Sequence, residues 1–398
     1  MPRFTPFPGI RYVRDDLSLV TAPPYDVIDA TERAELAARH DHNVVRIDLP
    51  VDDGSGADPY AAAGSQFEQW RADGVLGTDA PAFYLYRMTF ADEAGHTHET
   101  LGVIGALGIE PPGEGDVLPH EHTTPKAKSD RLQLLRSTAA NLSPVWGLSL
   151  ASGLSKLLDV ERAVPLGDWL DGDGVGHALW RIDDAGELTA IADAVGGAPL
   201  VIADGHHRYE TCGQYRAERR DAAGDAAGDY DATLCFVVEL VEDQLTVQPI
   251  HRLITGVDDG ADLAAALSPA FDVGPLEPLP DASVVDRLVR DGVLALVTAD
   301  GLRTLAPRPG AFAGVPELDS ARLDHALEAV PGHQLTYQHG VGAIVRAVTT
   351  GAAPAGVLLR PVSVAQIQST AHARAKMPPK STFFWPKPRT GTVFRSLG

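Results

Sequence analysis

The order of apolar and polar positions predicts an α/β protein with several antiparallel hairpins. Apolar runs rich in aromatic and β-branched residues cover residues 82–90 and 98–109, with a polar, glycine-containing turn between them. These two runs are expected to pair as a hairpin. A second hairpin is expected from residues 233–240 and 245–249, and a strand from residues 44–49.

Helical spacing is strongest in three further segments. Residues 59–73 place Phe67 and Trp70 on one helical face, and residues 126–140 and about 207–222 also predict helices. The last helix follows almost directly on a short apolar strand at residues 200–203. A strand end and a helix start are therefore expected to meet there.

Beyond residue 251 the pattern changes to alternating helices and strands, predicted at residues 263–267, 284–290, 293–298, 321–329 and 355–359. A chain of 398 residues can form two compact units. We expect a core of residues 1–255 and a C-terminal lobe of residues 256–398. The predicted class is mixed α/β (α+β), because the regular βαβ alternation of a doubly wound sheet is missing.

Composition and charge narrow the functional classes. Hydrophobic residues make up 44% and charged residues 22% of the chain, as in ordinary globular proteins. The net charge of −21 disfavours binding to a nucleic-acid backbone. No apolar run reaches the roughly 20 residues that a membrane span needs, and the N-terminus lacks a signal-peptide pattern. A cytoplasmic protein without a membrane partner is expected.

Two cysteines, Cys212 and Cys235, form neither a disulfide framework nor a zinc motif, and buried structural thiols are expected. The few lysines are more informative. They include Lys126 with Lys128, and a C-terminal group of Lys376, Lys380 and Lys387. Local positive charge on an acidic chain indicates an anion site.

The segment Asp204-Gly205-His206-His207-Arg208 is the strongest candidate for chemistry. It lies where the predicted strand ends and the helix begins. Backbone N–H groups at a helix N-terminus, a glycine and an arginine together suit an anion. Asp204 could hold a metal, act as a base or orient a histidine. The alternative is an Asx turn with a core histidine.

Two other segments could contribute to the same site. His120-Glu121 stands in a proline-bounded loop, and Lys128 and Arg131 stand in the helix that follows, so a catalytic Glu121 with phosphate-neutralising cations is possible. Lys380-Ser381-Thr382, after two prolines, offers one cation and two hydroxyls. A solvated loop and an exposed rigid tail are the structural alternatives.

Together these motifs resemble the bacterial and archaeal family of domain of unknown function 1015. The resemblance spans nearly the whole chain and follows the family's motif order. It rests on residues 23–28, His120-Glu121 through Asp130-Arg131, Asn141-Leu142-Ser143-Pro144, residues 204–211 and Met377-Pro378-Pro379-Lys380-Ser381-Thr382.

The Asp-Gly-His-His-Arg element is similar to that of the ParB and sulfiredoxin-like superfamily, whose members bind nucleotides and include kinases of free serine. The resemblance implies a ParB/sulfiredoxin-like core with an additional C-terminal α/β lobe, whose tail returns to the site. It implies a nucleotide-dependent phosphotransferase (a kinase) that uses Mg²⁺ with ATP or ADP. The leading acceptor is free L-serine, giving O-phosphoserine.

Carried onto this chain, the resemblance gives the site residues distinct roles. Glu121 is the candidate base for the acceptor hydroxyl, and Asp204 is the candidate metal ligand. Asp204, His206 and His207 form the rest of the catalytic group. The phosphate and nucleotide are expected to contact Gly205, Arg208, Lys128, Arg131, Lys380, Ser381 and Thr382.

Two other functions remain open from the sequence. The first is a nucleotide-gated regulator similar to the ParB switch, which would bind nucleotide and have no phosphoryl acceptor. The second is a hydrolase that uses the histidine–aspartate pair with a metal. Phosphate loops of the GxxxxGK[ST] and GxGxxG types are missing from the sequence, so neither of these nucleotide-binding modes is predicted.

Overall fold

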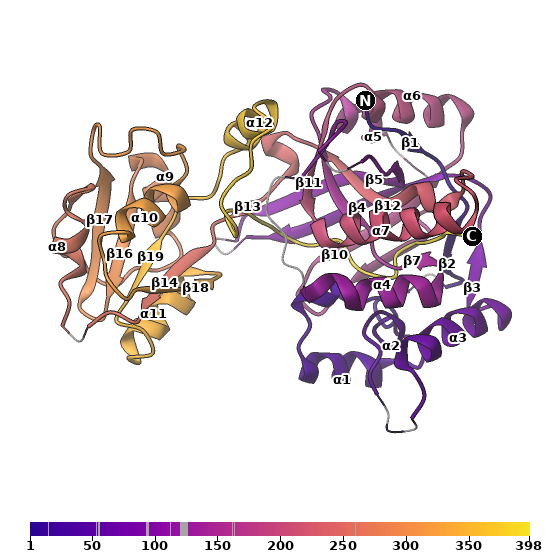
Figure 1. Cartoon of the computed structure of the whole chain (residues 1–398), viewed down its shortest axis with the longest axis horizontal. Helices are drawn as coiled ribbons and strands as arrows, with labels where there is room; N and C mark the ends of the chain where they lie inside the picture. Colours follow the sequence, from indigo (N-terminus) through magenta and orange to yellow (C-terminus); the bar gives the residue numbers. More distant parts are fainter. Residues whose placement is uncertain are drawn as a thin grey trace. The chain divides into compact units, whose positions relative to one another are not determined.

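The computed structural model describes residues 1–14, 16–52, 54, 56–92, 95–111, 113–119, 126–160, 162, 164–258 and 260–398. The chain forms two compact units (Figure 1). Unit 1 contains Met1–Ala91, Thr97–Leu245 and Pro386–Gly398, and unit 2 contains Asp92–His96 and Thr246–Trp385. The chain end therefore belongs to the first unit. The division into residues 1–255 and 256–398 stays a prediction.

The main element of unit 1 is a nine-stranded mixed sheet. Its strands run in the order β6-β11-β8-β12-β5-β4-β10-β9, and β1 also pairs with β5. Their bounds are β1 (Phe4–Thr5), β4 (Phe83–Ala91), β5 (Thr97–Gly108), β6 (Val117–Pro119), β8 (Val145–Ser149), β9 (Gly167–Leu170), β10 (Gly176–Ile182), β11 (Leu200–Asp204) and β12 (Ala232–Glu239).

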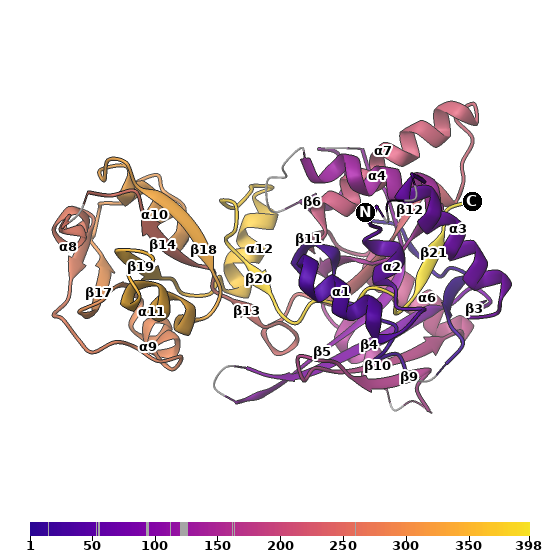
Figure 2. The same ribbon diagram turned by 90° about the horizontal axis from the view of Figure 1, so that it is seen from below.

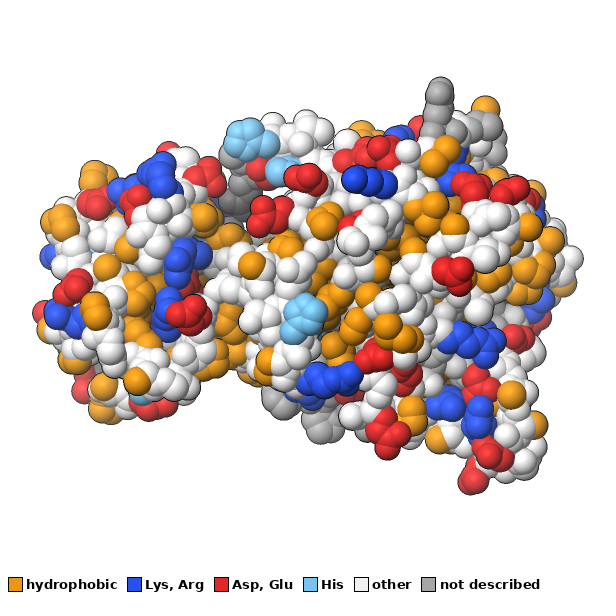
Figure 3. All heavy atoms as spheres, turned by 90° about the horizontal axis from the view of Figure 1, so that it is seen from above, with side chains coloured by type: hydrophobic (Ala, Val, Ile, Leu, Met, Phe, Trp, Pro, Cys, Tyr) orange, Lys and Arg blue, Asp and Glu red, His pale blue; other side chains and the backbone are white. Residues whose placement is uncertain are grey.

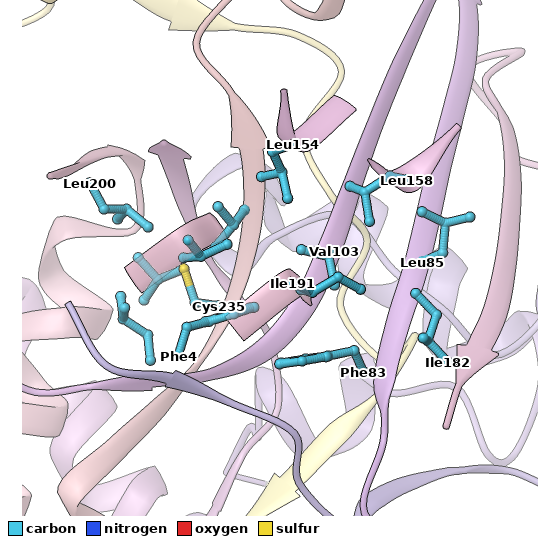
Figure 4. Packing of buried hydrophobic residues seen from close by; sticks show 14 of the residues in the cluster. Phe4, Phe83, Leu85, Val103, Leu154, Leu158, Ile182, Ile191, Leu200 and Cys235 are labelled. Atoms are coloured by element: carbon cyan, nitrogen blue, oxygen red, sulfur yellow. The ribbon is translucent and has the colours of Figure 1, made fainter. Parts of the chain in front are cut away.

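Helices cover both faces of this sheet. On one face, α5 (Leu154–Leu158) and α6 (Ala185–Gly196) pack on a core that includes Phe83, Val103 and Cys235 (Figure 4). On the other face, Cys212 and Tyr215 of α7 (His206–Ala222) pack with Leu132 and Leu135 of α4 (Lys126–Thr138). Helix α7 is thereby fixed next to β8 and β12.

A four-stranded antiparallel sheet joins distant parts of unit 1. Its order is β3 (Leu76–Thr78), β2 (Gly9–Tyr12), β21 (Phe394–Ser396) and β7 (Ala140–Asn141). Strand β21 pairs with β2 on one side and with β7 on the other. Figure 2 shows β21 close to the C-terminus. The remaining helices are η1 (Tyr25–Val27), α1 (Ala30–Arg39), α2 (Val45–Asp48), α3 (Pro59–Ala72), η2 (Asp229–Asp231) and η3 (Glu242–Gln244).

Unit 2 is a six-stranded antiparallel sheet between two pairs of helices. Alternate residues of β16 (Leu294–Thr298) enter different cores: Leu294 and Leu296 pack with α8 (Leu263–Leu267) and α10 (Asp319–Leu327), whereas Ala295 and Val297 pack with α9 (Val284–Asp291) and α11 (Val341–Thr349). Successive side chains of a strand point to opposite faces, so each helix pair covers one face. The other elements are β13 (Val247–Gln248), β14 (His251–Thr255), β15 (Phe271–Val273), β17 (Gly301–Pro307), β18 (Gln334–Gln338), β19 (Ala355–Leu358), α12 (Val364–His372) and β20 (Phe383–Phe384).

The structure confirms the mixed α/β class and the first predicted hairpin, which is β4–β5. Two local predictions were wrong. Residues 44–49 contain the short helix α2, because so few residues show no clear period that separates strand from helix. The predicted second hairpin does not form, since β12 pairs with β5 and β8 while β13 pairs with β20.

The surface carries both acidic and basic side chains. On the face drawn in Figure 3, basic side chains are scattered among acidic ones and form no continuous basic tract. Within the described parts of the chain, no helix combines the length and the apolar character that a membrane span requires.

Candidate functional site

The junction between β11 and α7 places the polar segment Asp204–Arg208 at the end of a strand of the main sheet. Strand β11 pairs with β8, and the register shifts between Ile202 and Asp204. Such a bulge re-aims the side chains that follow it. Gly205 then adopts φ +87°, and α7 begins at the next residue. The sequence prediction of a strand end leading into a helix is thus confirmed here.

Arg208 is the most buried ionic group of this junction, with 8% of its side chain exposed. Its guanidinium donates hydrogen bonds to the Asp204 carboxylate, one helical turn earlier, and to the Pro144 carbonyl oxygen. Pro144 belongs to the Asn-Leu-Ser-Pro motif that precedes β8. Two sequence motifs therefore hold one arginine in a fixed orientation.

Gly205 allows Arg208 to lie directly against the backbone. A Cβ atom at this position would lie 2.9 Å from Arg208 Nε and 3.0 Å from its Cζ. The positive φ is also unfavourable for any L side chain. Both the conformation and the close approach thus require glycine.

Replacing Gly205 with alanine is expected to lower the free energy of unfolding by about 1–2 kcal/mol and to displace Arg208. Gly153→Ala is the matched control, because Gly153 has φ +93° but nothing within 4 Å of its Cβ position. Urea unfolding should show a lower free energy of unfolding in both variants, because alanine disfavours the positive φ of each glycine. Only Gly205→Ala should lose further stability because Arg208 is displaced, and equal losses in the two variants would contradict this packing role.

Lys387, from the C-terminal segment of unit 1, completes the junction. Its Nζ lies 2.8 Å from Asp204 Oδ1 and 3.1 Å from Asp26 Oδ2. The lysine side chain is only 13% exposed. Asp26 belongs to the Pro23-Pro24-Tyr25-Asp26 motif. The first motif, the central motif and the chain end consequently meet at a single ion-pair network.

The charges of this network stabilise one another. Burial alone would raise the pKa of Asp204, but Lys387 and Arg208 hold it well below its ordinary value. Burial alone would lower the pKa of Lys387, but Asp204 and Asp26 raise it above its ordinary value. Near neutral pH, Asp204 is thus a carboxylate between two cations.

A second arginine lies close to the same motifs. Arg131 of α4 donates to the backbone oxygen of Asp48 at 2.8 Å and pairs with Asp48 Oδ1 at 3.1 Å. It also pairs with Asp130 at 2.7 Å, and its guanidinium lies over the Tyr25 ring at 4.2 Å from the centroid. Arg131 is therefore held in place by two carboxylates and by the ring of Tyr25, which belongs to the first motif.

The other predicted site residues fall into three groups. His206 and His207 are half-buried at the start of α7, and His206 is close enough to Asp204 to lower its pKa. His120 and Glu121 lie outside the described residues, as does the side chain of Lys128 in α4. The strand before them is described: β6 runs parallel to β11, with Pro119 opposite Ile202.

Lys380, Ser381 and Thr382 belong to unit 2. Lys380 is exposed, whereas Ser381 and Thr382 are buried. The Ser381 hydroxyl donates to the Pro378 carbonyl oxygen at 2.7 Å and lies 2.9 Å from Ser320 Oγ. The predicted return of this segment to the site, and its role with phosphate, stay predictions.

Sequence reasoning placed Lys387 in a C-terminal lysine group that indicates an anion site, but gave it no role in the site, and it did not single out Asp26 or Asp48. A signal existed for Lys387, which stands between Pro386 and Pro388 in a lysine-poor chain. Asp26 belongs to a motif that carried the family resemblance. Nothing in the sequence marked Asp48, which lies within residues 44–49, a segment predicted to be a strand.

The observed geometry does not fit Asp204 as a direct metal ligand. Both of its carboxylate oxygens contact cationic side chains, one from Lys387 and the other from Arg208. In the part of the chain that the structure describes, no group of three His, Cys, Asp or Glu side chains is arranged to hold a metal ion. The negative charge of Asp204 is therefore balanced by Lys387 and Arg208.

Comparison with known proteins identifies one family and several remote structural likenesses. A profile of the family "Protein of unknown function (DUF1015)" matches residues 4–326. No curated protein gives a significant sequence match.

Among solved structures, a variant of free serine kinase in complex with AMP shares 12% identity and a TM-score of 0.38, over 71% of this chain and 88% of that one. A conserved hypothetical protein from Pyrococcus furiosus shares 12% identity and a TM-score of 0.36, over 70% and 90%. SbnI with a C-terminal truncation, from Staphylococcus aureus, shares 9% identity and a TM-score of 0.39, over 73% and 85%.

Proposed function

The chain belongs to the DUF1015 family, and we propose that it is a cytoplasmic, nucleotide-dependent phosphotransferase that acts on a small hydroxyl metabolite. ATP or ADP is the proposed donor. Free L-serine is the first acceptor to test, following the family resemblance described above. The observation that carries the proposal is the convergence of Arg208 and Lys387 on Asp204 at the start of α7.

Phosphoryl transfer depends on positioning and charge neutralisation more than on a covalent nucleophile. The junction supplies the required groups: two held cations, two histidines and the first N–H groups of α7, where no side chain caps the helix. Such N–H groups favour phosphate oxygens. A phosphate carries more negative charge than a carboxylate, so it competes with Asp204 for Lys387 and Arg208.

In this proposal Asp204 is a positioning residue that keeps both cations at the junction. Mg²⁺ remains a proposed co-substrate that arrives with the nucleotide, and the chain's own contribution is to bind and orient the phosphates. His206 and His207 are proposed to contact the phosphates as well. Lys128, Arg131, Lys380, Ser381 and Thr382 stay proposed as further phosphate contacts.

Glu121 is proposed as the base that accepts the proton of the acceptor hydroxyl. The support comes from strand register. Pro119 pairs with Ile202 in parallel strands, and parallel strands end at the same edge of a sheet. In sequence, Glu121 follows Pro119 by the same number of residues as Asp204 follows Ile202.

The direct test is a product assay. Purified protein is incubated with Mg²⁺, ATP or ADP, and L-serine or other small hydroxyl compounds, and O-phosphoserine is measured by phosphorus NMR and mass spectrometry. Formation of a phosphorylated acceptor supports the proposal. The absence of turnover with every donor and acceptor would refute the phosphotransferase activity.

Glu121→Gln is expected to lower kcat by at least about 100-fold, because a positioned general base contributes roughly 10²–10⁴-fold. Nucleotide affinity should change less than about twofold, since glutamine keeps the shape of the side chain. Glu114→Gln is the control, because Glu114 is exposed in the preceding loop. A parallel loss of kcat and nucleotide affinity would assign Glu121 to binding instead.

One observation favours a second candidate, a nucleotide-gated switch without a phosphoryl acceptor. Lys387 lies on the C-terminal segment and is tied to Asp204. A ligand that draws Lys387 away from Asp204 would change how this segment is held. Nucleotide binding without product, together with ligand-dependent proteolysis near residues 386–398, would support the switch.

A further inference from the structure

A small cavity lies within unit 1 beside Arg208, and its wall combines polar side chains with apolar ones such as Leu134 and Leu142. Its volume is about 50 Å³. Since one water-sized group occupies roughly 10–15 Å³ by this measure, about three to five such groups fit. The lining includes Asp48, Arg131, Asn141, Arg208, Thr211 and Thr233. Three of the sequence motifs thus contribute to its wall, together with the end of α2.

Arg208, Arg131 and Asn141 of the wall already donate hydrogen bonds within the protein. Arg208 donates to Pro144 and Asp204, and Arg131 donates to Asp48 and Asp130. The Asn141 amide contacts Cys212 Sγ at 3.3 Å, and its carbonyl oxygen accepts from the Leu234 N–H at 2.9 Å. A negatively charged occupant would have to break these bonds.

Among the residues that the structure describes, two side-chain oxygens of the lining residues have no hydrogen-bond partner. They are Asp48 Oδ2 and Thr211 Oγ1. Both residues are almost fully buried, with 3% and 2% of their surface exposed. Leaving a buried oxygen without a donor is costly, and more so for a charged one. The Asp48 oxygen can only accept, whereas the Thr211 hydroxyl can accept or donate, so an occupant with hydrogen-bond donors would satisfy both oxygens.

We propose that this cavity receives the ammonium group of a small amino-acid-like metabolite, with Asp48 and Thr211 as its acceptors. The inference rests on the proposed function, because it makes the cavity the amino-group subsite of the phosphoryl acceptor. An ammonium group has three donors and a positive charge, which matches one carboxylate oxygen and one hydroxyl oxygen. The substrate class is then a hydroxylated primary amine rather than a hydroxy acid.

The electrostatics of Asp48 agree with this assignment. Burial raises the pKa of Asp48 above its ordinary value, although Arg131 and Arg208 both act to lower it. The two arginines thus compensate the buried charge only in part. A cation in the cavity would stabilise the ionised carboxylate.

Two ligands that differ at the amino group test the proposal. L-Serine carries an ammonium group where L-glycerate, which has the same configuration, carries a hydroxyl. Calorimetric titration of the full chain should give at least about tenfold tighter binding of L-serine, since hydrogen bonds to charged groups exceed neutral ones by that order. Equal affinity for the two, or binding of neither, would overturn the proposal.

Asp48→Asn is expected to reduce the affinity ratio of L-serine to L-glycerate by about 10- to 100-fold. The Asp48 backbone oxygen keeps its bond to Arg131 in this variant. Asp130→Asn is the matched control, since it also removes a carboxylate from Arg131 but does not line the cavity. It should leave the ratio unchanged, and equal ratios in both variants would refute the role of Asp48.

Thr211→Val is a second test of the subsite, chosen because this variant should fold like the native protein. Valine has the same shape and removes a hydroxyl that has no partner, so thermal stability should not fall. L-Serine affinity should drop about threefold to tenfold. Unchanged affinity would mean that the cavity holds only water. Binding that depends on Asp48 without any phosphorylated product would refute the proposed function while supporting the subsite. Turnover of L-serine and L-glycerate at equal kcat/KM would refute the subsite alone.

Discussion

Asp204→Asn is expected to lower the free energy of unfolding of unit 1 by about 3–5 kcal/mol at pH 7. The carboxylate is the shared partner of Arg208 and Lys387, which are 8% and 13% exposed. Asparagine keeps the shape but not the charge, so two buried cations lose their compensation. Urea unfolding followed by tryptophan fluorescence measures this, because Trp70, Trp146, Trp169 and Trp180 all lie in unit 1.

Asp26→Asn is the matched control for this variant. Asp26 contacts the same lysine, but its side chain is 42% exposed, and exposed ion pairs contribute about 0–1 kcal/mol. A loss below about 1 kcal/mol is therefore expected. Equal losses in the two variants would show that the junction is not organised around Asp204.

The stability difference between the native protein and Asp204→Asn should also depend on pH. Burial opposes ionisation of Asp204, but the two cations hold its folded-state pKa below the unfolded value of about 3.9. Its contribution is thus complete above the unfolded pKa and is lost as the pH falls toward the folded value. The difference should stay constant from pH 7 to about pH 5 and shrink below about pH 4. A difference that grows on acidification would contradict this ion-pair assignment.

Arg208→Ala is expected to weaken ADP or ATP binding by at least about 100-fold, the largest effect that we predict on ligand affinity. A buried guanidinium that contacts phosphate provides charge-assisted hydrogen bonds of about 1.5–3 kcal/mol each. Calorimetric titration at a temperature where unit 1 is fully folded measures this loss. Arg208→Lys should restore part of the affinity, since it returns the charge but not the planar fork.

Arg216→Ala separates a site effect from the loss of positive charge on α7. Arg216 lies on the same helix, but it pairs with Asp231 at 2.8 Å, away from the junction. Its removal should change nucleotide affinity by less than about twofold at physiological salt, because surface charges beyond a Debye length are largely screened. Unchanged affinity in Arg208→Ala would remove this arginine from the nucleotide site.

Several parts of the structure follow from local sequence alone. The β4–β5 hairpin formed where two apolar runs flank a polar turn, and α7 began where an apolar strand meets Gly205. Alternation and helical spacing act over a few residues, so they can be recognised without knowing the rest of the fold. The same holds for the polar segment from Asp204 to Arg208, whose strand-to-helix position was predicted correctly.

The partners of that segment were decided only by the tertiary structure. Lys387 reaches Asp204 because β21 carries the chain end between β2 and β7. Asp48 reaches Arg131 because residues 45–48 form a helix rather than the expected strand. Pairings between distant segments depend on the chain path, and no local period encodes that path. The sequence therefore determined which polar segment could carry chemistry, and the fold determined which charges surround it.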